Sequence, residues 1–433
     1  MGMKILVVGS GGREHALCWR VRADRPDTDL YCAPGNAAIA GIATTVPLAA
    51  DDIPGLVDWS VASRPDLVIV GPEDPCALGL VDRLAEAGIR AFGPSAAATW
   101  LESSKAWTTH LLDRAGVPIP DSAIFETPAD AHDYVDDSIE PLVVKADGLA
   151  LGKGVLVCDT PDEAHAAIDA IMVEREFGDA GATVVIQERC YGPELSVFAI
   201  CAGTSYRIIG SARDYKRAYD GDEGLNTGGV GAYSPVADAD DALLRDVADR
   251  IIGPTLQASS DAGRPFTGVL YAGLMLTENG PVVIEFNIRF GDPEAQVILP
   301  TMRGDLVAAM LAAIDGDVST IDLVPDGSAA VCVVLASGGY PVSYETGQKI
   351  EGLDALPPGA LAFHAGTETR NDGLYTAGGR VLGIVGTGPD VPAARANAYA
   401  AVDEVTFQEC QWRSDIAAAE QSPARKSPSV VPA

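Results

Sequence analysis

The chain has 433 residues, of which 47% are hydrophobic, and a formal net charge of −31. This length exceeds what one compact core accommodates and predicts about two to four domains. The strong negative charge disfavours binding to nucleic acid, and no apolar run reaches the roughly 18 residues that a membrane span requires.

The first hundred residues alternate between strand-like and helix-like segments. Strands are expected at residues 4–8, 30–33, 67–70 and 91–92, and helices at 13–23 and 81–87. This alternation predicts a doubly wound parallel sheet for residues 1–103, with helices on both faces. The N-terminus runs straight into glycines without the basic start of a signal peptide, so a cytoplasmic location is expected.

A glycine loop, residues 9–15, follows the first strand and opens the first helix, an arrangement whose backbone amides bind phosphate well. The third glycine of a dinucleotide fingerprint would fall on Glu14, and Ala33 and Pro34 stand where its ribose-binding acid belongs. NAD binding is therefore disfavoured. A smaller phosphate-bearing ligand fits better, held by Arg13 and by the loops at 34–36 and 71–73, although these glycines could equally make tight turns.

Residues 104–324 are expected to form a nucleotide-binding region with a mobile lid at about 120–188. A predicted strand ends at Lys145, one of only seven lysines, and leads into a glycine loop at 148–154. Such a loop can fold over phosphates, although a plain hairpin is also possible. A further strand, 184–188, ends in a hinge that could bond adenine, and Glu194 could accept ribose hydroxyls.

The segment EFNIRFGDPE, residues 285–294, carries the most informative pattern. Alternation along a strand places Glu285, Asn287 and Arg289 on one face. Magnesium prefers oxygen ligands and takes only one or two from protein, which Glu285 and Asn287 supply. Arg289 could hold a carboxylate or acyl phosphate bidentately. A solvated sheet face is the alternative.

The remaining segments are less specific. Asp214 to Arg217 clusters positive charge, and residues 226–235 read as a glycine-rich loop; either could be a surface turn. Residues 325–328 look like a linker before a small C-terminal domain of short strands and turns, 325–420, and the tail 421–433 is expected to be disordered. The eight cysteines are scattered without a Cys-x-x-Cys pair, which predicts buried, reduced thiols.

Ten motifs occur in a fixed order: GSGGREHA, APGNA, VGPE, FGPS, ESSKAW, VVKADGLALGKGV, NTGGVGAYSP, FTGVLYAGLM, EFNIRFGDPE and FHAGT. Together, over residues 3–415, they resemble the phosphoribosylamine–glycine ligase family of the ATP-grasp superfamily. The resemblance implies an α/β and α+β multidomain protein with a central ATP-grasp fold and a small mixed C-terminal domain. It also implies a monomeric enzyme of small-molecule substrates, with ATP as co-substrate and Mg²⁺ or Mn²⁺ as cofactor, that joins glycine to 5-phosphoribosylamine through glycyl phosphate.

The resemblance also assigns roles to individual residues. For ATP it implies Lys105, Lys145, Gly148, Gly152, Lys153, Gly154, Glu188 and Glu194. For the metal it implies Glu285 and Asn287, and for glycine or its phosphate Arg289, Asp214 and Lys216. The residues implied to bind or line the substrates are Gly11, Gly12, Arg13, Asn36, Glu73, Asn226, Gly228, Gly229, Asp292 and Glu294.

The sequence departs from the family pattern at Leu151, Gln187, Arg213, Tyr215 and Val230. Arg213 and Tyr215 flank the implied glycine pocket. Three other functions are considered: an ATP-grasp ligase for a different acid or amine, a nucleotide-binding regulator without catalysis, and an NAD-dependent oxidoreductase. The retained pair Glu285 and Asn287 argues against the regulator.

Overall fold

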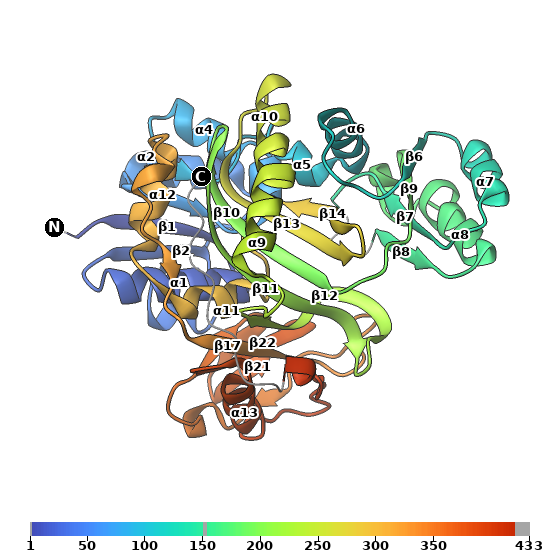
Figure 1. Ribbon diagram of the computed structural model, residues 1–433. Helices are drawn as coiled ribbons and strands as arrows, with labels where there is room; N and C mark the ends of the chain where they lie inside the picture. Colours follow the sequence, from blue (N-terminus) through green and yellow to red (C-terminus); the bar gives the residue numbers. More distant parts are fainter. Residues whose placement is uncertain (1, 150–153, 421–433) are drawn as a thin grey trace.

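The computed structural model describes residues 2–149 and 154–420 (Figure 1). The predictions for Leu151, Gly152, Lys153 and the tail 421–433 lie outside the described residues. In the described part of the chain, no helix is long and apolar enough to cross a membrane.

The N-terminal residues form a five-stranded parallel sheet in the order β3-β2-β1-β4-β5, as the sequence predicted. Its strands are β1 (Lys4–Gly9), β2 (Asp29–Pro34), β3 (Thr44–Thr45), β4 (Leu67–Val70) and β5 (Ala91–Phe92). Leu6 and Val8 face one hydrophobic core with the helices α2 (Ile53–Ser63) and α4 (Leu80–Glu86), whereas Ile5 and Val7 face the other with α1 (Gly12–Asp24). The strand order reverses between β1 and β4, where ligands bind in such sheets.

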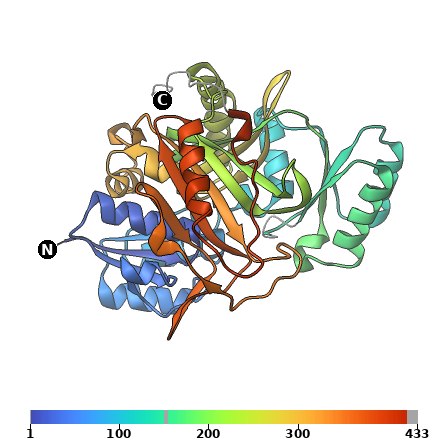
Figure 2. The same ribbon diagram turned by 90° about the horizontal axis from the view of Figure 1, so that it is seen from below.

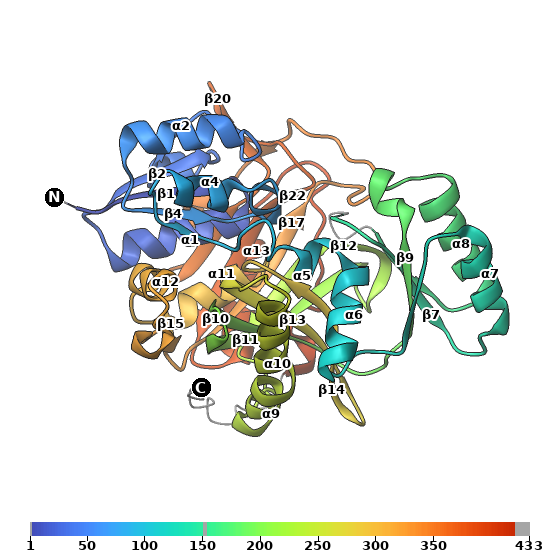
Figure 3. The same cartoon turned by 90° about the horizontal axis from the view of Figure 1, so that it is seen from above.

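A second unit, with its own hydrophobic core, lies on the opposite side of the molecule from the N-terminal sheet (Figure 3). It is a four-stranded sheet in the order β6-β9-β7-β8, covered by α7 (Pro128–Asp137) and α8 (Pro161–Ile168). The strands are β6 (Ser122–Phe125), β7 (Leu142–Ala146), β8 (Val155–Cys158) and β9 (Val184–Glu188). Helices α5 (Trp100–Ser103) and α6 (Lys105–Ala115) connect the two sheets along the chain.

An eight-stranded antiparallel sheet occupies the centre, in the order β14-β13-β10-β11-β12-β17-β22-β19. Its central-region strands are β10 (Glu194–Ala202), β11 (Ser205–Tyr219), β12 (Glu223–Ser234), β13 (Thr267–Thr277) and β14 (Gly280–Asn287). Helices α9 (Asp241–Val247), α10 (Gly253–Asp261), α11 (Ala295–Ile298) and α12 (Leu306–Ile314) also belong to this region.

The C-terminal residues extend the same sheet, because β12 pairs with β17 (Ala329–Ala336). The other C-terminal elements are β22 (Arg380–Gly388), β19 (Ala360–His364), α13 (Val391–Val402) and a small sheet of β18 (Lys349–Ile350), β21 (Gly373–Thr376) and β20 (Thr367–Arg370). Figure 2 shows these elements, in orange and red, beside the N-terminal sheet in blue. The predicted α/β and α+β multidomain architecture is confirmed.

One local prediction is wrong. Residues 226–235 were expected to be a glycine-rich loop, but they lie almost entirely in β12. Residues 214–217, for which a surface turn was the alternative, lie in β11. The glycines of β12 serve close packing instead. Gly229 has φ +104°, and a Cβ there would stand 2.5 Å from Pro293 Cδ, while one on Gly231 would stand 2.5 Å from Ile416 Cδ1.

The cysteine prediction is confirmed. All eight cysteines are free thiols, and six of them are buried. The C-terminal module contains a feature that the sequence reading omitted, the twelve-residue helix α13, which packs on β22 and β17.

Candidate active site

One cleft of about 1190 Å³ lies where the N-terminal sheet, helix α6, the four-stranded sheet and the central sheet meet. Its size suits several small molecules at once. Most of the predicted site residues line it: Arg13, Glu73, Lys105, Lys145, Gly148, Gly154, Glu188, Glu194, Asp214, Lys216, Asn226, Gly228, Glu285, Asn287, Arg289, Asp292 and Glu294. Gly11, Gly12, Asn36 and Gly229 are not among its lining residues.

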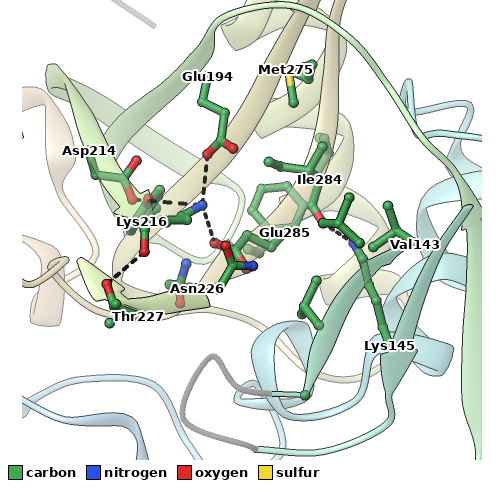
Figure 4. A pocket seen from close by; sticks show the side chains of 18 of the residues that line it. Val143, Lys145, Glu194, Asp214, Lys216, Asn226, Thr227, Met275, Ile284 and Glu285 are labelled. Atoms are coloured by element: carbon green, nitrogen blue, oxygen red, sulfur yellow. Dashed lines mark hydrogen bonds and ion pairs between the residues drawn. The ribbon is translucent and has the colours of Figure 1, made fainter. Parts of the chain in front are cut away.

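Lys216 stands at the centre of a group of carboxylates (Figure 4). Its Nζ lies 2.9 Å from Glu194 Oε2, 3.3 Å from Glu285 Oε1 and 3.8 Å from Asp214 Oδ2. Lys216 lowers the pKa of Glu285 to about 2, against the effect of burial, so Glu285 is ionised. Burial raises the pKa of Asp214 to about 8, although Lys216 opposes this. Lys216 therefore balances the negative charge of Glu194 and Glu285. A bound cation could balance the same charge.

Glu285 and Asn287 lie two residues apart at the end of β14, and both line the cleft. A carboxylate and an amide oxygen suit magnesium, which commonly takes the rest of its shell from phosphate and water. In residues 2–149 and 154–420, no three His, Cys, Asp or Glu side chains form a ready metal cage. The donor set therefore fits a metal ion that arrives with a phosphate ligand better than a permanently caged one.

Two lysines supply positive charge on the other side of the cleft. Lys145 Nζ donates to Ile284 O at 2.8 Å, and Lys105 Nζ donates to Gly148 O at 2.9 Å. Burial lowers the pKa of both, that of Lys145 to about 8. A polyanion bound here would raise both pKa values again and gain a strong interaction with the two ammonium groups in this low-dielectric setting.

An apolar slot adjoins these lysines, between the four-stranded sheet and the central sheet. Val143, Met275 and Ile284 face it in Figure 4. Gln187, near the end of β9, is buried, and its Nε2 donates to Ser122 Oγ at 2.9 Å. Flat apolar walls beside a polar strand end suit a planar base. The sequence reading missed these wall residues because apolar strand residues are ordinarily core.

The N-terminal glycine loop packs closely on the turn after β14. A Cβ on Gly12 would stand 2.5 Å from Gln296 Nε2, and Arg13 N donates to Asp292 Oδ2 at 3.2 Å. Asn36 binds protein rather than lining the cleft. Its Nδ2 donates to Ser10 O at 2.9 Å and to His364 O at 2.7 Å, so it joins this loop to the C-terminal domain.

Arg380, on β22, was not predicted as a site residue. Its Nη1 donates to the carbonyls of Gly228 at 2.5 Å, Gly229 at 3.2 Å and Asp292 at 2.6 Å. Its guanidinium therefore fixes β12 against the 291–294 turn at the cleft wall. No local motif could reveal this, because only the pairing of β17 with β22 brings Arg380 to the cleft.

The unusual residues Arg213 and Tyr215 alternate with Asp214 and Lys216 along β11 and thus point to the opposite face. Arg213 Nε donates to Glu194 O at 2.8 Å, and the Tyr215 hydroxyl accepts from Ala417 N at 2.9 Å. Both residues still line the cleft, and the carbonyl that Arg213 contacts belongs to Glu194, whose carboxylate contacts Lys216.

Three family models match the chain: the phosphoribosylglycinamide synthetase N domain at residues 3–102, its ATP-grasp (A) domain at 103–295 and its C domain at 330–419. A relative from Rhodopirellula baltica, named phosphoribosylamine–glycine ligase, is 47% identical over 95% of this chain and 96% of its own length. One from Mesorhizobium japonicum with the same name is 44% identical over 96% of this chain and 97% of its own.

The chain belongs to the phosphoribosylamine–glycine ligase family. The crystal structure of the Thermotoga maritima ligase matches with a TM-score of 0.82 at 32% identity, covering 96% of this chain and all of that one. The biotin carboxylase domain of Hydrogenobacter thermophilus 2-oxoglutarate carboxylase, solved with magnesium ADP, has a TM-score of 0.73 at 14% identity, over 95% of this chain and 92% of that one. The latter likeness concerns the fold alone. This chain is thus an ATP-dependent ligase with the ATP-grasp fold, as predicted.

Proposed function

We propose that this chain ligates glycine to 5-phosphoribosylamine, converting ATP to ADP and phosphate and giving glycinamide ribonucleotide, the second step of de novo purine synthesis. The observation that carries the proposal is a cleft that combines Lys105 and Lys145, the ionised carboxylate of Glu285 beside Lys216, and the guanidinium groups of Arg13 and Arg289. Membership of the family supports the choice of substrates.

The reaction needs no protein nucleophile. A carboxylate oxygen of glycine attacks the γ-phosphorus of ATP, the bond to ADP breaks, and glycyl phosphate forms. The amine nitrogen of phosphoribosylamine then attacks the acyl carbon, inorganic phosphate leaves, and the nitrogen loses a proton. Catalysis rests on holding the reactants in line and on neutralising charge as it moves.

The chain's own residues would divide this work. Lys105, Lys145, Gly148 and Gly154 hold the ATP phosphates, and Glu188 and Glu194 lie by adenine and ribose. Arg289 holds the glycine carboxylate, aided by Asp214 and Lys216. The amine substrate lies toward the N-terminal loop, by Gly11, Gly12, Arg13 and Asn36. The other residues assigned to substrates are Glu73, Asn226, Gly228, Gly229, Asp292 and Glu294.

Glu285 and Asn287 would hold Mg²⁺ or Mn²⁺. The metal would supply further positive charge to the phosphates, which favours transfer of the γ-phosphoryl group.

The domain boundaries also remain a proposal, at residues 1–103, 104–324 and 325–420. The limits of the family models support them. The separate sheet and core of residues 122–188 support a lid at about 120–188. The cytoplasmic location, the monomeric state and the lack of nucleic-acid partners remain predictions. Sedimentation of the purified chain can test whether it is a monomer.

A drop-out assay tests the proposal. Phosphate release by the purified chain should require ATP, magnesium, glycine and phosphoribosylamine together. Alanine, serine and β-alanine in place of glycine separate this activity from that of another ATP-grasp ligase. Free exchange of glycine for these acids would contradict the assignment.

A further inference from the structure

A row of alternating charges crosses the floor of the cleft. Arg289 Nη2 donates to Glu102 Oε1 at 3.1 Å, and Arg289 Nε donates to Glu73 Oε2 at 2.9 Å. The same Glu73 oxygen lies 3.9 Å from Arg13 Nη1. Glu102 comes from α5, Glu73 from the start of α3 (Glu73–Ala77), and Arg289 follows β14. The row therefore joins the N-terminal sheet to the central sheet through side chains alone.

The row continues into the N-terminal glycine loop. Arg13 Nε donates to Glu14 Oε1 at 2.6 Å, and the other oxygen of Glu14 accepts from Gly11 N at 2.7 Å. Glu14 stands where a dinucleotide fingerprint would have its third glycine. Here the Glu14 carboxylate binds both the backbone of Gly11 and the side chain of Arg13. An acid at this position therefore holds the loop closed and orients Arg13.

The charges in this row are shielded from water. The exposed fractions of the side chains are 18% for Arg289, 13% for Glu73, 10% for Glu102 and 9% for Arg13. Buried charges are costly unless each has a partner with good geometry. Burial opposes ionisation of Glu73, yet Arg289 and Arg13 outweigh it and lower its pKa to about 2. Glu73 is therefore a fixed anion between two cations.

The carboxylates cannot themselves bind glycine's carboxylate, because like charges repel. A guanidinium has five N–H donors in a planar fork. The two carboxylates engage Nε and Nη2 of Arg289, and among the described residues Nη1 has no hydrogen-bond partner. Glu102 has a second anchor, since its Oε2 accepts from Ile288 N at 2.9 Å. The plane of Arg289 is thus set by two protein carboxylates, with a donor left for a ligand.

We propose that Glu102 and Glu73 are positioning residues for the ligation: Glu102 orients Arg289 for the acyl substrate, and Glu73 joins Arg289 to Arg13, so that the acyl and amine sites share one electrostatic unit. This deepens, and rests on, the proposed function. It predicts different consequences for the two carboxylates. Of the two arginines, Glu102 contacts only Arg289, on the acyl side. Glu73 lies between Arg289 and Arg13, on the amine side.

The test compares KM for glycine and KM for phosphoribosylamine in Glu102→Gln and Glu73→Gln, with Glu86→Gln on the exposed surface as matched control. Glu102→Gln should raise KM for glycine about tenfold or more, which is the order expected when a hydrogen bond to a charged group is lost. Its KM for phosphoribosylamine should stay at the wild-type value. Glu73→Gln should raise both constants, and Glu86→Gln neither.

Glu102→Asp keeps the charge with a shorter reach and should recover part of the glycine affinity, which a role in folding alone would not give. If Glu102→Gln does not fold, Glu102→Asp carries the comparison with Glu73→Gln. Equal changes of both constants in the two variants, or no change, would overturn the proposal. A wild-type chain that fails to turn over glycine and phosphoribosylamine would instead overturn the proposed function.

Discussion

Glu102→Gln should change how stability depends on pH. Burial raises the pKa of Glu102 to about 7, from an ordinary 4.5, although Arg289 opposes this shift. The neighbouring carboxylate Glu73 raises this pKa further. Each tenfold change in an ionisation constant corresponds to about 1.4 kcal/mol, so ionising Glu102 costs the folded protein about 3 kcal/mol more than the unfolded chain. That cost is absent below the pKa that Glu102 has in the unfolded chain and complete above the pKa that it has in the folded protein. Wild-type stability therefore falls by up to this amount as pH rises from 4.5 to about 7.

Glutamine has the shape of the protonated carboxyl and does not ionise, so the variant lacks this decline. Its free energy of unfolding relative to wild type should increase by about 3 kcal/mol between about pH 4.5 and pH 8. Urea unfolding at both pH values measures this. Tryptophan fluorescence can follow the unfolding, and two of the five tryptophans, Trp100 and Trp107, lie on α5 and α6 near Glu102. Glu86→Gln controls for loss of an exposed carboxylate. A difference from wild type that does not vary with pH would refute the reasoning.

Three further substitutions test separate parts of the account. Glu285→Ala should abolish turnover with an unchanged circular dichroism spectrum; activity retained at saturating magnesium would sink the metal assignment. Gly229→Ala should lower the free energy of unfolding by more than about 1 kcal/mol in urea, because alanine is strained at φ +104° and would meet Pro293; wild-type stability would refute the claimed close packing. Tyr215→Phe should leave KM for glycine unchanged, because Tyr215 faces away from Lys216; a marked rise in KM would place it in the glycine pocket.

Much of the fold followed from local patterns. The parallel N-terminal sheet could be predicted because its apolar strand segments alternate with helical ones, a pattern typical of such sheets. Alternation along residues 282–289 brought Glu285 and Asn287 to one face, which the end of β14 reproduces. Arg289 lies beyond the strand, and its orientation depends instead on Glu73 and Glu102.

The remaining features depend on contacts between distant segments. The glycines of β12 suggested a loop, because sequence cannot reveal that Pro293 and Ile416 would occupy the space of their side chains. Arg380 lies 152 residues from its partner Gly228, and strand pairing alone brings them together. Glu102 was not singled out in the sequence, because its contact with Arg289 depends on bringing together two segments that are 187 residues apart.

The central claim is that glycine's carboxylate is phosphorylated by ATP before the amine attacks. Glycine labelled with heavy oxygen in both carboxylate oxygens tests this directly, with mass spectrometry of the released phosphate. The account predicts that each phosphate carries one heavy oxygen derived from glycine and that the other stays in the amide of glycinamide ribonucleotide. Phosphate released without label, while the amide product forms, would contradict it.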